Sequence, residues 1–168
     1  MVSRSAIVDI QTFTGSGTWT KPVGAVLVQV EMFGGGAGGG SGRCGAAGGA
    51  RFGGGGGGAG GRTEAFFLAS LLGATETVTI GAGGAGGAGV GPAATDGNPG
   101  IAGGNTTFGA HLRAGGGNPG GGGTTTTGTG GNGSSAGTDL NAIVVSSSTN
   151  VPVGAQGGSS QEDPFTTG

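Results

Sequence analysis

Hydrophobic and polar residues alternate with a period of two in several segments, as they do in β-strands that bury one face. The clearest is 26–33, where one face holds Val26, Val28, Val30 and Met32 and the other holds Leu27, Gln29, Glu31 and Phe33. Weaker patterns predict strands over 7–14, 62–72, 75–80, 105–114 and 140–147. Trp19–Pro22 is expected to be a short edge segment closed by proline. No helix is predicted, and Leu71-Leu72 has room for one turn at most.

These strands predict a small hydrophobic core. Its expected members are Trp19, Val28, Val30, Phe66, Val78, Ile80, Phe108 and Leu112. We therefore predict an all-β fold, a small jelly-roll-like β-sandwich with long glycine-rich loops. The sandwich is expected over 1–123, a Thr/Gly/Ser-rich segment with a last strand over 124–148, and an extended polar tail over 149–168.

Glycine-rich blocks separate the strands. In 34–61, one period-three register holds Gly36, Gly39, Gly42, Gly45, Gly48, Gly54, Gly57 and Gly60, with Arg51 as its exception. A period of three matches polyproline-II geometry, in which only glycine fits on the inward edge of a packed bundle. The block is either a bundle of polyglycine-II helices, a set of stacked loops, or a flexible linker.

Two further blocks follow. Residues 81–89 are three Gly-Ala-Gly triplets, and the sequence Gly-Asn-Pro-Gly occurs at 97–100 and again at 117–120. Proline followed by glycine favours a type II turn, because glycine accepts positive φ. We predict a turn at each copy.

Composition narrows the class of protein. Glycine supplies 50 of the 168 residues, but runs such as 56–58 break the Gly-X-Y register of collagen. The net charge of −2 and the 33% of hydrophobic residues argue against simple disorder. The six basic residues are spread singly, which argues against nucleic-acid binding. With one cysteine, Cys44, and no apolar run at the N-terminus, we expect a chain that folds in a cytoplasm without membrane insertion.

No segment carries a credible catalytic, cofactor or metal site. Residues 81–86 match G-x-G-x-x-G, but no helix can start after them to hold a pyrophosphate. His111 is the only histidine, and we expect it on the solvent face of a strand. The paired acids Glu162 and Asp163 lie in the polar tail. We therefore predict that the protein is not an enzyme.

Large side chains within the glycine blocks are the better candidates for binding. Arg43, Arg51 and Phe52 either point outward from a rigid glycine lattice, where they would bind a partner, or pack on the sheet edge. The two asparagines of the Gly-Asn-Pro-Gly copies, Asn98 and Asn118, complete the candidate contact set.

The order of the motifs along the chain, and not only their composition, points to a known family. Residues 12–22 read TFTGSGTWTKP, a valine-rich strand then enters a glycine block, and VTIGAGGAGG and GGNTTFG follow. This order resembles the glycine-rich domain of tailed-bacteriophage tail fibre and tip adhesin proteins, over 12–123. That resemblance implies a small β-sandwich with projecting glycine-rich loops whose tips contact a receptor.

We therefore expect a virion protein, made in the bacterial host cytoplasm, that attaches to a glycan or protein of the host surface. The expected partners are other virion proteins, and the thin core predicts a homotrimer. A purely structural virion component, such as a head fibre, decoration protein or tail appendage, is the alternative. Ice binding by a polyglycine-II slab has only the threonines at 124–127 in its favour.

Overall fold

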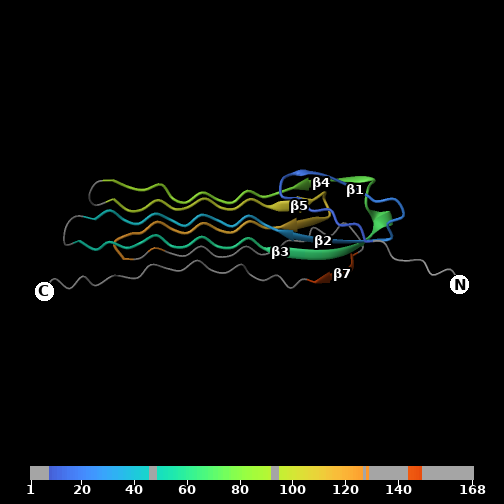
Figure 1. The fold of residues 1–168 in the computed structure, drawn as a ribbon. Coiled ribbons are helices and arrows are strands. Elements are labelled where there is room, and N and C mark those ends of the chain that lie inside the picture. The colour runs from blue at the N-terminus through green and yellow to red at the C-terminus, as the bar shows by residue number, and fades with distance from the viewer. Residues whose placement is uncertain (1–7, 46–48, 92–94, 127, 129–143, 149–168) are drawn as a thin grey trace.

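The strands gather at one end of an elongated molecule, and undulating segments run from them to the other end (Figure 1). The computed structural model describes residues 8–45, 49–91, 95–126, 128 and 144–148. The strands are β1 (Gly17–Thr20), β2 (Leu27–Phe33), β3 (Arg62–Leu68), β4 (Thr75–Thr79), β5 (Thr106–Phe108), β6 (Leu112–Ala114) and β7 (Val144–Ser148). A 3-10 turn, η1, covers Ala69–Leu71.

The strands form two antiparallel sheets, which confirms the all-β prediction. One sheet has the order β1-β4-β5-β6 and the other the order β2-β3-β7. The sheets meet across the core, where the Thr63 hydroxyl on β3 donates a 3.1 Å hydrogen bond to the Arg113 carbonyl on β6. The last strand of the 124–148 segment thus completes the second sheet.

The core follows the alternation along the strands, with one correction. Its buried members are Trp19, Met32, Ala65, Phe67, Leu72, Val78, Phe108, Leu112 and Ala114, with Phe13, Val28, Val30 and Ile80 packed against them. Phe66 was expected in the core, but Phe67 is the fully buried residue. The reason is register, because Thr63, Ala65 and Phe67 face inward on β3 and their neighbours face outward.

Two strand predictions differ from the structure, and a third is tested only in part. Residues 8–14 form no strand. The first strand is β1, Gly17–Thr20, and it pairs only with β4. The predicted strand over 105–114 is a hairpin that turns at Gly109, whose φ is +51°. The last strand begins at Val144, and the rest of its predicted range lies outside the described residues.

Among the described residues, five segments continue from the sheets and run along the molecule. We call them rod A (34–45), rod B (49–61), rod C (81–91), rod D (95–105) and rod E (115–124). Their pairing continues that of the strands. Rods A and B are hydrogen-bonded like β2 and β3, and rods C, D and E follow the order β4-β5-β6.

Backbone hydrogen bonds join the rods at every third residue. Rod A donates to rod B from Gly34, Ala37, Gly40 and Arg43, and to rod D from Gly35, Gly38, Ser41 and Cys44. Burial has the same period, since every third residue of rod C from Gly84 to Val90 is half-buried between two exposed ones. No described rod glycine has positive φ. The rods are therefore polyglycine-II helices rather than a flexible linker, and they satisfy one another's backbone groups.

The predicted glycine register is right for rod B and wrong for rod A. A Cβ at Gly54, Gly57 or Gly60 would lie 2.1–2.2 Å from a carbonyl oxygen of rod A. In rod A the blocked glycines include Gly35, Gly38 and Gly40, at 1.9–2.2 Å, whereas Gly36, Gly39 and Gly42 have more room, at 3.1–4.0 Å. Rod A is hydrogen-bonded to rods B, C, D and E, so more than one of its edges faces inward.

The two Gly-Asn-Pro-Gly copies are not turns. Both lie within rods, and neither Gly100 nor Gly120 has positive φ. Proline is accommodated because its fixed φ matches polyproline-II geometry and its missing N–H is not needed in that register. The asparagine carbonyls accept bonds from neighbouring rods, Asn98 from Ser41 and Asn118 from Gly58, each 2.9 Å long.

Candidate binding site at the distal tip

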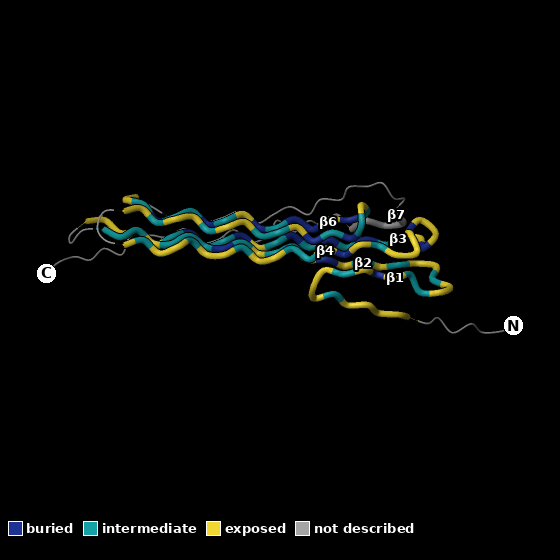
Figure 2. Tube along the Cα trace, turned by 90° about the horizontal axis from the view of Figure 1, so that it is seen from above, coloured by how far each residue is buried: buried dark blue, intermediate teal, exposed yellow. Residues whose placement is uncertain are grey.

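Rods A, B and D place their far ends together at the end of the molecule opposite the strands (Figure 1). Buried positions are concentrated around the strands, and the rods are mostly half-buried or exposed (Figure 2). The end of the bundle away from the strands is called the distal tip here. Cys44 and Thr95 join rods A and D there through two reciprocal backbone hydrogen bonds of 3.0 and 2.9 Å.

The charged side chains of the described rods all lie at the distal tip. They are Arg43 on rod A, Arg51 on rod B and Asp96 on rod D. The rest of each rod consists of uncharged residues, mainly glycine and alanine. Two arginines and one aspartate give the tip a formal charge of +1, opposite in sign to the −2 of the whole chain.

Arg43 is held between three rods. Its backbone N–H donates a 2.9 Å bond to the Phe52 carbonyl on rod B, and its guanidinium Nη1 forms an ion pair with Asp96 on rod D. The side chain is only 13% exposed. Its Nε is buried and has no hydrogen-bond partner among the described residues. Because a guanidinium carries five N–H donors, the single contact with Asp96 leaves donor capacity unused.

Phe52 and Arg51 behave oppositely. Phe52 is 7% exposed, so the outward-pointing alternative is excluded for this residue, and its place at the distal tip, away from the strands, excludes the sheet edge as well. Arg51 is exposed, and its stem lies across Gly45, where an added Cβ would come within 2.8 Å of the Arg51 Cγ.

The two asparagines lie at different levels of the bundle. Asn98 is exposed on rod D two residues from Asp96, and its Nδ2 donates a 2.9 Å bond to the Ala88 carbonyl. Asn118 is exposed on rod E beside Gly58, near the strand end of the bundle. The structure thus brings Arg43, Arg51 and Phe52 together and adds Asp96. The only sequence signal for Asp96 is that it is the one acid in its glycine-rich block.

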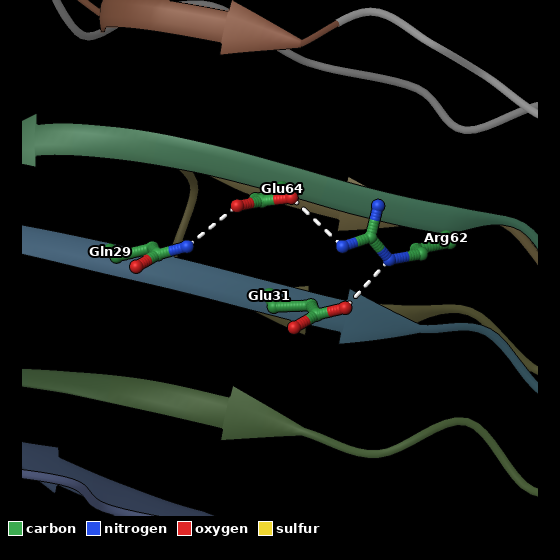
Figure 3. Close-up of polar contacts among 4 residues, drawn as sticks. All are labelled: Gln29, Glu31, Arg62 and Glu64. Carbon is green, nitrogen blue, oxygen red and sulfur yellow. Dashed lines mark hydrogen bonds and ion pairs between the residues drawn. The ribbon is translucent and has the colours of Figure 1, made fainter.

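A second polar cluster lies on the outer face of β2 and β3 (Figure 3). Glu64 accepts a 2.6 Å bond from Gln29 and a 2.8 Å bond from Arg62, and the Arg62 Nε donates a 2.6 Å bond to Glu31. The hydrogen bond with Glu31, ahead of the other contacts, raises the pKa of Arg62 above its ordinary value. These groups face one another across the strand pair, so the cluster supports the pairing of β2 with β3.

His111 lies in the β5–β6 turn and not on a solvent-facing strand, so that expectation is wrong. Its Nε2 is 3.2 Å from Glu76 Oε1, and its ring centroid is 6.0 Å from that of Phe67. The turn at Gly109 tilts the imidazole back over the core. In the described part of the chain, no three side chains of His, Cys, Asp or Glu are grouped to hold a metal ion.

The comparison with known families agrees with this architecture. The sequence profile of the family described as glycine-rich domain matches residues 11–168, well over half of the chain. The chain belongs to the glycine-rich domain family. No curated protein matches it. The described residues of this glycine-rich domain protein include no helix with the length and hydropathy needed to cross a membrane.

Proposed function

We propose that this glycine-rich domain protein is a fibre or adhesin protein of a bacteriophage virion that attaches to the bacterial host surface through its distal tip. The observation that carries the proposal is the position of charge, because Arg43, Arg51 and Asp96 lie together at the end of rods whose other described residues are uncharged. The motif order over 12–123, which resembles tail fibre and tip adhesin domains, supports the virion context.

The bundle suits such a role because it is stiff. Each rod is hydrogen-bonded to its neighbours at every third residue, so the backbone that carries the tip side chains is fixed before a ligand arrives. Holding a site in its bound shape lowers the entropy lost on binding. Glycine allows the rods to pack this closely, since most inward positions have no space for a Cβ.

The strand end is the proposed anchor to other virion proteins. Val26, Leu27 and Leu68 meet there, where β2 begins and β3 ends, and are 76%, 53% and 39% exposed. Exposed aliphatic side chains that lie next to one another are typical of surfaces that contact another protein. The same thin sandwich would gain burial as a homotrimer. The protein would be made in the host cytoplasm and act without catalysis, cofactor or nucleic acid.

The test is adsorption of the labelled full chain to intact cells from a panel of bacterial strains. Removing rod A would break contacts with four rods, so point variants are the better probes. Arg51→Glu reverses an exposed charge at the tip, and Arg113→Glu makes the same change on β6 at the strand end. Adsorption lost in Arg51→Glu and kept in Arg113→Glu supports the adhesin. A folded chain that adsorbs to no strain favours the purely structural virion component.

A further inference from the structure

The unpaired donor of Arg43 is the feature that its structural role leaves unexplained. Leaving a buried N–H without an acceptor is unfavourable by the desolvation of that group, and the described neighbours offer Nε none. The ion pair with Asp96 uses Nη1 and fixes the guanidinium between rods A and D. The guanidinium is therefore oriented by the fold with part of its donor set still open.

A second cation lies on the neighbouring rod B. Arg51 is one residue from Phe52, whose carbonyl accepts the Arg43 N–H, and its stem crosses Gly45, two residues from Arg43. Asp96 balances only one of the two positive charges, and it is 56% exposed. The tip therefore offers one oriented guanidinium and one exposed guanidinium with a net positive charge.

We infer that the distal tip binds an oxyanion, the phosphate or carboxylate group of an acidic bacterial surface glycan, between Arg43 and Arg51. The inference rests on the proposed function and names the ligand chemistry of that site. Arg51 would contact the anion from the solvent side, and the buried Nε of Arg43 would reach it after a shift of that side chain that keeps the bond to Asp96. Guanidinium groups suit both anions because their planar donors match two oxygens at once.

The test uses the isotope-labelled full chain, whose Arg43 Nε–H gives its own NMR signal. The probes are inorganic phosphate, glucuronate and, as the neutral control, glucose. We expect the Arg43 signal to shift and saturate at about 1–10 mM phosphate or glucuronate, the range of a few charge-assisted bonds. The two anions separate a phosphorylated from a carboxylated glycan. No saturable shift with either anion, or an equal shift with glucose, overturns the inference.

Variants test the geometry. Arg51→Gln should weaken the response about fivefold, as expected for one exposed charge pair, and Arg113→Gln on β6 should leave it unchanged. Arg43→Lys keeps a cation for Asp96 but removes the Nε donor, so it should weaken binding without loss of fold. Equal effects of Arg51→Gln and Arg113→Gln would mean general attraction of anions and no site.

The outcome is separable from that of the proposed function. Adsorption to cells that phosphate and glucuronate fail to inhibit, with no NMR response, would leave the adhesin standing and remove the oxyanion site. An Arg43 response to phosphate in a chain that adsorbs to no cell would support the oxyanion site and count against the adhesin. Inhibition of adsorption by one anion at its NMR half-saturation supports both.

Discussion

Two neighbouring glycines of rod C provide the sharpest test of the polyglycine-II packing. A Cβ at Gly84 would lie 1.9 Å from the Ile101 carbonyl oxygen on rod D. A Cβ at Gly83 would meet only the Gly36 carbonyl oxygen, at 3.8 Å, which is ordinary contact. Replacing each with alanine therefore makes the same chemical change on two edges of one rod.

The two substitutions should change the free energy of unfolding in opposite directions. Bringing the Gly84 contact to 3.0 Å requires rods C and D to separate by about 1.1 Å, which would stretch the 2.8 Å bond from Ile101 N to Ala85 O beyond bonding range. Overpacking costs about 1–3 kcal/mol and each lost bond about 1 kcal/mol, so Gly84→Ala should lower the free energy of unfolding by about 2–4 kcal/mol. Gly83→Ala should raise it by up to about 1 kcal/mol, because alanine restricts the unfolded chain.

Urea unfolding, followed by the fluorescence of the single tryptophan, measures the sandwich, since Trp19 is buried in its core. Hydrogen exchange of the rod amides measures the bundle separately, so a rod that opens alone is still detected. Alanine already stands at Ala82, Ala85 and Ala88, so the rod conformation itself accepts it. Equal losses in the two variants, or a greater loss in Gly83→Ala, would refute the packing of rod C on rod D.

Three further predictions concern the sandwich and its assembly. The Thr106 hydroxyl donates to the Phe33 carbonyl at 2.6 Å and accepts from the Gly81 N–H at 3.0 Å, so Thr106→Val should lower the free energy of unfolding by about 1–3 kcal/mol in thermal denaturation, and Thr106→Ser should retain most of it. Gly109→Ala places a Cβ 2.5 Å from the Glu76 carboxylate at a residue whose φ is +51°. We therefore expect the free energy of unfolding to fall by about 1–3 kcal/mol. An unchanged melting temperature would contradict the left-handed turn at Gly109. Light scattering should give three times the 15.2 kDa chain mass, and a monomer across the concentration range would exclude the homotrimer.

Much of the fold could be predicted from local pattern. The alternation in 26–33 correctly placed β2 and its inward face, because a period of two assigns faces without reference to any partner. The same reasoning failed at 8–14, which alternates less clearly and forms no strand. It also failed at 105–114, where Gly109 reverses the chain within one alternating run.

The candidate site was predicted only in part. The arginines were recognisable as the large cationic groups of a glycine block, and they do lie at the tip. Asp96 could not be assigned to them, because 52 residues separate it from Arg43 and only the pairing of rods A and D brings the two together. The burial of Phe52 depends in the same way on rods that the local sequence does not specify.

The sequence by itself pointed to polyproline-II geometry in the glycine blocks, since glycine recurs there with a period of three, but it left stacked loops and a flexible linker as alternatives. Only the tertiary structure decided which glycines must be glycine. A polyglycine-II helix makes no hydrogen bonds of its own, so its environment comes entirely from its neighbours. Rod A has four of them among the described residues, and its crowded edges include Gly35, Gly38 and Gly40 rather than the predicted register. The local sequence therefore favours the conformation of each rod, whereas segments remote in the sequence decide which of its glycines are in close contact.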